Sequence, residues 1–195
     1  MKLLVCAATQ SELKTIKTSI KLLNLKQQLP IEYFCCWIGN IITTLTLTEY
    51  LTRNSGNNYF IVNIGICGYT QSQETCIQGA TVYYLPNWKE AIIPSFLKFA
   101  PLKKLISSEV IVDNLELLWP LQHEEYFIDM ESWAIEQVSQ HFKYPRLILK
   151  VPIDRIWEET KHFDHEKALR WLAEHIDYKK LVENVLEYME KLEDR

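Results

Sequence analysis

Apolar runs of strand length alternate along this chain with segments of helical periodicity. Apolar runs or alternating positions predict strands, and apolar residues that recur every three or four positions predict helices. The first segments read as a strand over 2–8, a helix over 11–23 and a strand over 31–38. Segment 41–53 is ambiguous, because its TTLTLT run favours a strand, whereas its length and its position after a Gly-Asn step favour a helix.

The rest of the chain continues the alternation. Segment 59–65 is a continuous apolar run, typical of strands that are buried on both faces. The further strands are expected over 81–85, 105–112, 126–130 and 147–153, and the further helices over 132–142, 165–176 with Asp164 as N-cap, and 178–192. This order predicts an α/β fold with a parallel or mixed sheet.

Composition is that of an ordinary globular chain. Of 195 residues, 48% are apolar and 12% aromatic, which excludes intrinsic disorder. The length and the lack of a linker or repeat predict a single domain over 1–195. No run approaches the ~20 apolar residues of a membrane span, and the apolar start is too short for a signal-peptide core. We therefore expect a cytoplasmic protein without a membrane partner.

Charge and cysteine content exclude several kinds of site. The 21 basic and 25 acidic residues give a net charge of −4, and no basic stripe is present, so no nucleic-acid partner is expected. The five cysteines are odd in number and lack CxxC spacing, which argues against a zinc knuckle or a disulfide framework. His162-x-x-His165 has near-metal spacing but no evident third ligand. We expect neither a metal nor a cofactor.

Polar residues just after strands are the candidates for chemistry, because ligands of such folds bind beyond the carboxyl ends of strands. Glu12 follows the first strand, although Thr9-x-x-Glu12 also has the spacing of a helix capping box. Gly65 and Gly68 follow a buried strand, where glycine allows close approach of a ligand, although a tight turn explains the pair almost as well.

Two further strand ends carry carboxylates. Asp129 and Glu131 project on the same face by strand alternation, and two buried carboxylates cost free energy unless they bind something. The alternative for Glu131 is a place in the first helical turn, where the dipole favours it. Asp154 ends the last apolar run, and a surface pair with Arg155 or a helix cap explains it equally well.

Taken in order, these segments resemble the nucleoside phosphorylase superfamily, and within it the nucleosidase branch with methylthioadenosine/S-adenosylhomocysteine nucleosidase and futalosine hydrolase. The most specific motif is the family's Val-Glu-Met-Glu-Ala, to which Ile128-Asp129-Met130-Glu131-Ser132 is similar. The other matching segments are the first turn with Glu12, Trp37-Ile38-Gly39-Asn40, the glycine loop over 63–69, Pro152-Ile153-Asp154 and Phe163-Asp164. The resemblance implies a three-layer sandwich whose central mixed, twisted sheet is flanked by helices.

The resemblance also implies roles. Glu12 is expected to deprotonate the attacking water, and Asp154 to protonate the departing base. Glu131 is expected to bind the ribose hydroxyls, with Met130 packed on the sugar. The remaining residues expected to border the substrate are Ile66, Gly68, Val112 and Asp129. Such chemistry needs one protonated and one anionic carboxyl, which differences in burial can provide.

The chain departs from the family at three positions: Ile66 replaces a serine or threonine, Tyr69 replaces a glycine, and Val112 stands where an aromatic walls the adenine. The first loop also lacks the arginine that holds phosphate in phosphorylases, which favours hydrolysis. Three hypotheses stay open: a hydrolase of a purine-type nucleoside, a non-catalytic relative that binds a nucleoside or a protein partner, and, third, a phosphorylase.

A homodimer is also expected. Four tryptophans exceed the need of a core of this size, and aromatic residues are enriched at the centres of interfaces. They are Trp37, Trp88, Trp119 and Trp133. The nucleosidases that the chain resembles are dimers whose partner edges the site.

Overall fold

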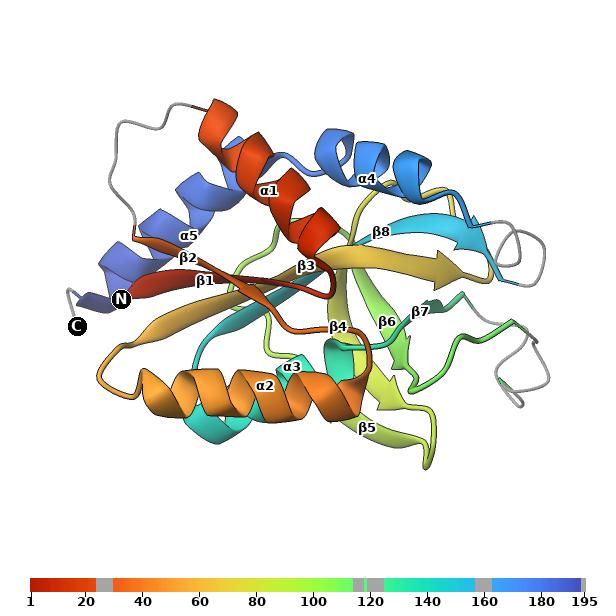
Figure 1. Ribbon diagram of the computed structural model, residues 1–195, viewed down its shortest axis with the longest axis horizontal. Coiled ribbons are helices and arrows are strands. Elements are labelled where there is room, and N and C mark those ends of the chain that lie inside the picture. The colour runs from red at the N-terminus through yellow and green to blue at the C-terminus, as the bar shows by residue number, and fades with distance from the viewer. Residues whose placement is uncertain (24–29, 114–117, 119–124, 157–162, 194–195) are drawn as a thin grey trace.

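The structure is a computed structural model that describes residues 1–23, 30–113, 118, 125–156 and 163–193. Within these residues, eight strands form one mixed sheet with helices on both faces (Figure 1). The strands are β1 (Lys2–Ala7), β2 (Ile31–Cys35), β3 (Tyr59–Tyr69), β4 (Ile77–Tyr84), β5 (Lys89–Ile92), β6 (Leu102–Ser107), β7 (Phe127–Asp129) and β8 (Arg146–Arg155). The α/β class and the mixed sheet expected from the sequence are confirmed.

The sheet closes on itself around β3. On one edge, β3 pairs in parallel with β1 over its first half and antiparallel with β7 at its carboxyl end. On the other edge it pairs in parallel with β8. From β8 the pairing passes to β4, β6 and back to β7, so five strands form a ring. Outside it, β1 extends the sheet from β3, β2 pairs with β1, and β5 pairs with β4. The ring brings the carboxyl ends of β3, β7 and β8 together.

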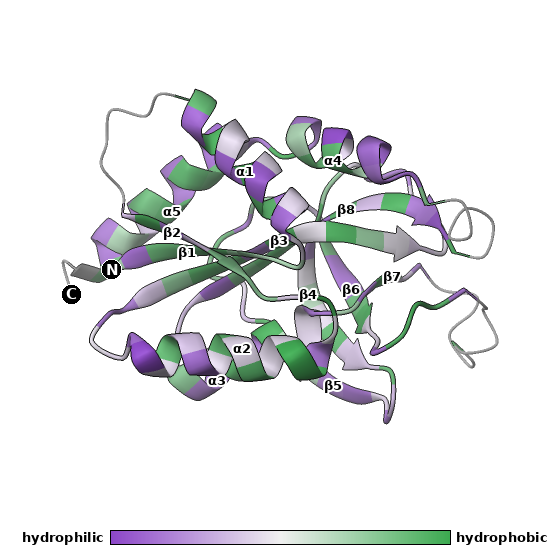
Figure 2. Cartoon of the chain, in the orientation of Figure 1, coloured by the Kyte–Doolittle hydropathy of each residue, from purple (hydrophilic) through white to green (hydrophobic). Residues whose placement is uncertain are grey.

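Helices cover the two faces of the sheet and bury its apolar side chains. On one face lie α1 (Gln10–Leu22), α4 (His165–Glu174) and α5 (Tyr178–Glu193), and on the other lie α2 (Asn40–Arg53) and α3 (Ser132–Phe142) (Figure 1). Ile16 of α1 packs with Phe60 of β3 on the first face, and Leu47 of α2 packs with Ile61 on the second. Figure 2 shows hydrophobic residues along the central strands and alternating colours on the helices. The three-layer arrangement is therefore confirmed.

Several segments differ from the sequence expectation. The strand expected over 31–38 ends at Cys35, the strand expected over 81–85 begins at Ile77, and β5 was not expected. The ambiguous segment is the helix α2, whose Thr44 and Thr46 hydroxyls donate to carbonyl oxygens four residues earlier. The strand expected over 105–112 is wrong at both ends, since β6 spans Leu102–Ser107. The Ser108 N–H makes the last hydrogen bond to β7, to the Asp129 carbonyl oxygen (2.8 Å), and the chain then leaves the sheet.

Two further observations bear on the expectations from composition. The five cysteines are all free and buried. Across the described helices, none combines the length and the apolar character needed to cross a bilayer.

Candidate active site

A cavity of about 510 Å³ lies at the carboxyl ends of the strands, between the first turns of α1, α3 and α4. We call it the site cavity. Its lining includes every residue that the sequence predicted for the site, from five segments far apart in the chain. These residues are Glu12, Ile66, Gly68, Val112, Asp129, Met130, Glu131 and Asp154.

Glu12 is both a helix cap and a wall of the site cavity. Its Oε2 accepts hydrogen bonds from the Thr9 N–H and hydroxyl, both at 2.9 Å, and Thr9 Oγ1 accepts from the Glu12 N–H at 3.2 Å. The predicted capping box is thus present. The other oxygen, Oε1, lies 3.5 Å from the point where a Cβ atom on Gly65 would stand. One carboxylate therefore serves the helix with one oxygen and faces the cavity floor with the other.

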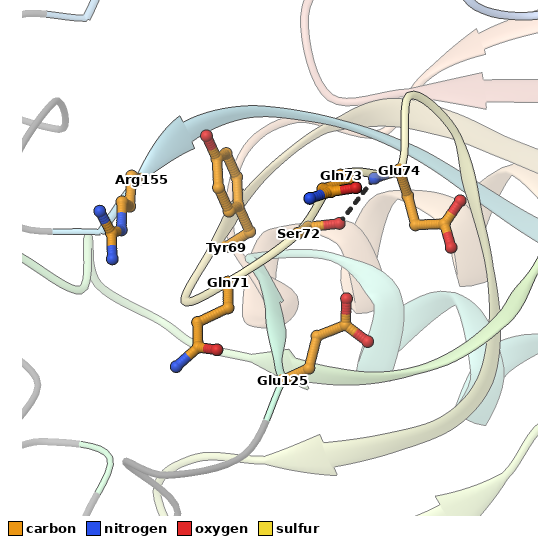
Figure 3. Close-up of a pocket in the computed structure, with 7 residues that line it drawn as sticks. All are labelled: Tyr69, Gln71, Ser72, Gln73, Glu74, Glu125 and Arg155. Atoms are coloured by element: carbon orange, nitrogen blue, oxygen red, sulfur yellow. Dashed lines mark hydrogen bonds between the residues drawn. The ribbon is translucent and has the colours of Figure 1, made fainter.

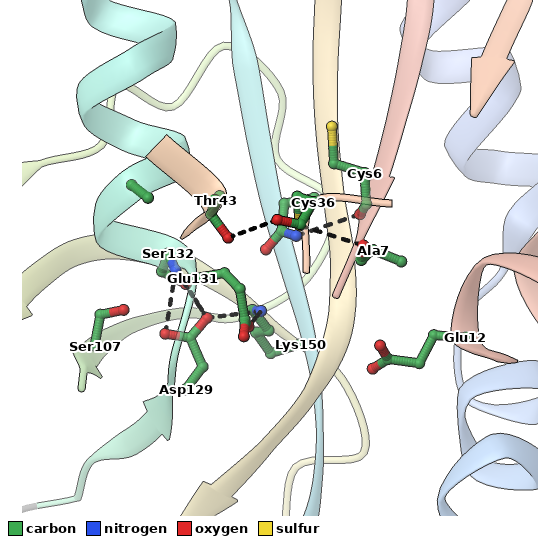
Figure 4. A network of polar contacts seen from close by, with 12 residues as sticks. Cys6, Ala7, Glu12, Cys36, Thr43, Ser107, Asp129, Glu131, Ser132 and Lys150 are labelled. Carbon is green, nitrogen blue, oxygen red and sulfur yellow. Dashed lines mark hydrogen bonds and ion pairs between the residues drawn. The ribbon is translucent and has the colours of Figure 1, made fainter. Parts of the chain in front are cut away.

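A buried lysine that the sequence interpretation missed lies beneath the acids. Lys150, in the middle of β8, is 1% exposed, and its Nζ lies 2.6 Å from Asp129 Oδ2 and 3.6 Å from Glu131 Oε2. Figure 4 shows Lys150 beside these two carboxylates, with Glu12 directed toward the same place from α1. A lysine inside an otherwise apolar strand is the signal that would have found it, because a buried ammonium needs a carboxylate partner.

Asp129 is fully engaged with the protein. Besides Lys150, its carboxylate accepts from the Ser132 N–H and hydroxyl at the start of α3. Glu131 is less occupied: its Oε1 accepts only a long bond from the Gly39 N–H, at 3.3 Å, and its Oε2 lies at the 3.6 Å distance from Lys150. Of the two predicted acids, Glu131 is therefore the one with oxygens to offer to a ligand.

The two carboxylates favour the charged form of Lys150, whereas Asp129 disfavours the charged form of Glu131. Burial lowers the pKa of Lys150, but Asp129 and Glu131 outweigh it and hold that pKa above the usual value. Burial raises the pKa of Glu131 to about 7, and Asp129 and Glu12 add to the rise, against the opposing effect of Lys150. Near neutral pH the lysine is charged and Glu131 is near its midpoint.

Gly65 leaves a space between these groups. A Cβ atom placed on Gly65 would lie 3.3 Å from Lys150 Nζ and 3.5 Å from Glu12 Oε1. Because the side chain is absent, the Lys150 ammonium and the Glu12 carboxylate can both approach β3 at this point.

A bulge directs Asp154 to the site cavity. Along the β3–β8 ladder Cys67 pairs with Pro152 but Gly68 pairs with Asp154, so one residue of β8 is skipped. A Cβ atom on Gly68 would lie 3.3 Å from Ile156, which is a tight contact, and 3.8 Å from Asp154 Oδ2, which is an ordinary one. Bulges of this kind re-aim side chains near active sites. The half-buried Asp154 thereby lines the cavity opposite Glu12's helix.

The outer wall of the site cavity is apolar. Ile38, Val110, Ile111 and Phe163 line it although they are 45–68% exposed. Phe163 supplies an aromatic ring from the start of α4, whereas Val112, at the position of the family's aromatic wall, is 5% exposed within the core. An occupant of the cavity would remove these side chains from water and be stabilised by that burial.

A second, more polar cleft of about 790 Å³ opens beside Tyr69 and Arg155 (Figure 3). Its lining contains none of the predicted site residues. Nearby, Lys103 is paired with Glu125 at 2.6 Å and with Glu74 at 3.6 Å, so these acids already have a cation. The chemistry is concentrated in the site cavity.

Sequence comparisons find no relative: no family model matches the chain, and no curated protein does. Solved structures are similar to it over nearly the whole length. A nucleosidase for 5′-methylthioadenosine and S-adenosylhomocysteine from Helicobacter pylori, a mutant with 5′-methylthioadenosine in its active site, has a TM-score of 0.74 at 15% identity, covering 95% of this chain and 98% of that chain. A structure from Francisella philomiragia, described as a putative nucleosidase of that kind, has a TM-score of 0.74 at 14% identity, covering 93% and 98%.

Futalosine hydrolase from Helicobacter pylori is similar as well, with a TM-score of 0.69 at 16% identity over 91% of this chain and 97% of that one. Such identities show the fold, and the coverage shows that no large part of these proteins is missing here. The chain has the fold of the methylthioadenosine/S-adenosylhomocysteine nucleosidases and of futalosine hydrolase, as the order of its motifs indicated.

Proposed function

We propose that the protein is a nucleosidase, which hydrolyses the N-glycosidic bond of a purine-type nucleoside and releases the free base and a ribose derivative. The observation that carries the proposal is the meeting of Glu12, Glu131 and Asp154 in one cavity of a nucleosidase fold. Similar structures hold 5′-methylthioadenosine, adenine or 8-aminoadenine, which supports a purine-type ligand.

Each acid has a part in the proposed reaction. A water beside Glu12 gives a proton to this carboxylate as its oxygen attacks the anomeric carbon. The bond from that carbon to the base nitrogen breaks, and Asp154 acts from its protonated form, delivering its proton to the departing base. Glu131 accepts hydrogen bonds from the ribose hydroxyls, with Met130 beside the sugar.

The charge of the cavity suits this transition state. As the bond to the base breaks, positive charge develops on the ribosyl group, and fixed carboxylates near the sugar stabilise it more strongly than the neutral substrate. Lys150 does not cancel this effect, because its ammonium is held by Asp129 at 2.6 Å, beneath the cavity. The catalytic field therefore comes from Glu12 and Glu131.

Water is a better acceptor here than phosphate. The described lining of the site cavity contains no arginine or lysine, and Lys150 is committed to carboxylates. The amides that a phosphate would need are also in use, since Thr9 N–H donates to Glu12 and Gly39 N–H donates to Glu131. A phosphate dianion would face two carboxylates without a free cation, which costs free energy.

The test is a panel of purine nucleosides incubated with pure protein, with and without phosphate, while free base and ribose are separated by chromatography. We expect base release that does not depend on phosphate. The Asp154→Asn variant is expected to bind the nucleoside with nearly unchanged affinity in calorimetry but to lose turnover, because an amide keeps the shape and a hydrogen-bond donor without a proton to transfer.

The alternative is a protein that binds a nucleoside without cleaving it. Ile66 lines the cavity where the family has a hydroxyl group, and this observation favours altered activity. Binding without base release in the wild type would establish the alternative. Turnover by Asp154→Asn at the wild-type rate would remove the role of Asp154.

We also propose a homodimer and a cytoplasmic location. Five free, buried cysteines support a reducing compartment. For the dimer, Trp88 and Trp133 give little support, because both are half-buried against core clusters, and Trp119 lies outside the described residues. Trp37, 52% exposed, begins an apolar patch that continues along the start of α2. This patch consists of Trp37, Ile38, Ile41, Ile42 and Leu45, with Val110 and Ile111 beside it.

A further inference from the structure

Residues 108–113, which we call the strap, follow β6 and form part of the cavity wall without regular structure. Val110 and Ile111 line the site cavity from the strap while 60% and 68% exposed. Val112 is 5% exposed and packs in a core cluster with Ile128 and Ile156. The strap is thus anchored by apolar packing at Val112, and its two exposed apolar residues lie between that anchor and Glu109.

Glu109 fixes the other side of the strap to two different elements. Its Oε1 accepts from the Tyr84 hydroxyl on β4 at 2.8 Å, and its Oε2 lies 3.4 Å from the Ile41 N–H in the first turn of α2. The Tyr84 ring is itself held, stacked on Trp133 of α3 with the ring centroids 5.4 Å apart. The positive end of α2 favours a carboxylate at this point. Glu109 does not line the site cavity, so it holds the strap without itself facing a ligand.

The start of α2 also binds the strap's first residue and the ribose-facing acid. The Asn40 side chain donates to the Ser108 carbonyl at 3.1 Å and accepts from the Ala134 N–H of α3 at 3.0 Å. One residue earlier, the Gly39 N–H donates to Glu131. The same helical turn therefore positions the strap and Glu131 relative to each other.

We propose that Glu109 is a positioning residue, a latch that holds the strap in the cavity wall and thereby sets the affinity for substrate. The effect on substrate binding rests on the proposed function, whereas the effect on the strap does not. Val110 and Ile111 can contribute burial to a ligand only while the strap is held over the cavity. Glu12, Glu131 and Asp154 lie on other segments, so release of the latch leaves the chemical step in place.

The test compares Glu109→Ala and Tyr84→Phe with Glu90→Ala, a control on an exposed position of β5. In Glu109→Ala, amide hydrogen exchange over 109–112 is expected to accelerate about tenfold or more, since a hydrogen-bonded charged anchor is lost. KM for the nucleoside is expected to rise about tenfold, with kcat within about twofold. Tyr84→Phe keeps the stacked ring, removes one bond, and is expected to give a smaller change in the same direction.

The outcomes separate the latch from the enzyme. Exchange over 109–112 that stays at the wild-type rate in Glu109→Ala overturns the latch. Faster exchange with unchanged KM overturns its role in binding. If the wild type cleaves no nucleoside, the proposed function fails, and the affinity for adenine in calorimetry replaces KM: equal affinity in wild type and Glu109→Ala then overturns the proposal, and a roughly tenfold loss supports it.

Discussion

At the scale of single residues, Glu12 shows that a capping role and a place in the site do not exclude each other. The spacing Thr9-x-x-Glu12 predicted a capping box, and the structure contains it. The cap uses Oε2 alone, while Oε1 borders the space at Gly65. Sequence spacing can identify the cap because it is local. It cannot show the second oxygen's neighbours, which come from β3 and β8.

We expect Glu12→Gln to keep the helix and to lose the general base. The amide oxygen still accepts from the Thr9 N–H, so the thermal midpoint should stay close to that of the wild type. Base release should fall by roughly 10²–10⁴. The control is Glu166→Gln in the first turn of α4, which should change neither quantity. Activity within a few-fold of the wild type at unchanged stability would show that Glu12 is only a cap.

Lys150 marks the limit of sequence reasoning at this scale. The run over 147–153 was correctly expected to be a strand. Because the residues around Lys150 are apolar, nothing near it in the sequence indicated the carboxylates that pair with it. Its partners Asp129 and Glu131 are some twenty residues earlier in the chain and meet it only through the pairing of β3 with both β7 and β8. The acids were predictable from motif and strand ends, and a lysine in an apolar strand was visible, but its pairing with these two acids required the topology.

The raised pKa of Glu131 predicts a pH-dependent cost to stability. The folded protein holds this pKa at about 7, against an ordinary value of 4.5. Between these two pH values the folded state binds more protons at this site than the unfolded state does. The free energy of unfolding therefore falls as pH rises from 4.5 to 7, by at most about 3 kcal/mol from this group.

The measurement is denaturant unfolding of wild type and Glu131→Gln across that range, with Glu190→Gln as a control on the exposed side of α5. A glutamine carries no such proton, so the stability of Glu131→Gln relative to wild type should increase from pH 4.5 to 7. Parallel curves for the two proteins would mean that Glu131 is not held near neutrality.

At the scale of elements, burial decided what local propensity left open. The β-branched residues of α2 favoured a strand, but Leu47 and Leu51 share a buried helical face and the threonine hydroxyls bond back to the helix. The strand predicted over 105–112 does not continue past Ser107, although its residues have strand propensity. Val110 and Ile111 are as apolar as strand residues, yet they line a cavity. The short edge strand β5 was missed because its Lys89–Ile92 sequence is mostly exposed.

Gly79 of β4 offers a test of how tightly the ring of strands is packed. A Cβ atom there would lie 2.7 Å from Leu105 Cδ1 and 3.0 Å from Ile93 Cδ1, both in buried side chains. Gly79→Ala should therefore destabilise the protein by about 1–3 kcal/mol through overpacking. Gly56→Ala is the matched control, since nothing lies within 4 Å of its Cβ position.

Denaturant unfolding measures both variants. Gly56→Ala should be neutral or slightly stabilising, because alanine restricts the unfolded chain. Equal stabilities for Gly79→Ala and Gly56→Ala would show that β6 and the segment after β5 yield without cost, contrary to a closely packed ring.

At the scale of the whole molecule, the site exists because the sheet closes. Alternating strands and helices predicted an α/β sheet, but nothing local in the sequence indicates that β7 pairs with the edge of β3 opposite β8. That closure brings Gly68, Asp129 and Asp154 to one cavity. The family motifs carried this information only as order along the chain. The departures at Ile66 and Val112 were visible in the sequence, while the aromatic contribution of Phe163 to the cavity required the fold.

The apolar patch at the start of α2 makes the homodimer testable at the same scale. Its five apolar side chains are 40–64% exposed and adjoin one another, and clustered exposed apolar side chains are a candidate interaction surface. Leu45, 62% exposed, lies in the patch but outside the cavity lining.

We expect the wild type to show twice the chain mass of 23.1 kDa in light scattering at micromolar concentration. Leu45→Asp should show the single-chain mass, because a carboxylate buried in an apolar interface is costly. Leu22→Asp, at a 75% exposed position of α1 away from the patch, should keep the wild-type mass. A wild-type mass of one chain would refute the dimer, and a dimeric Leu45→Asp would place its interface elsewhere.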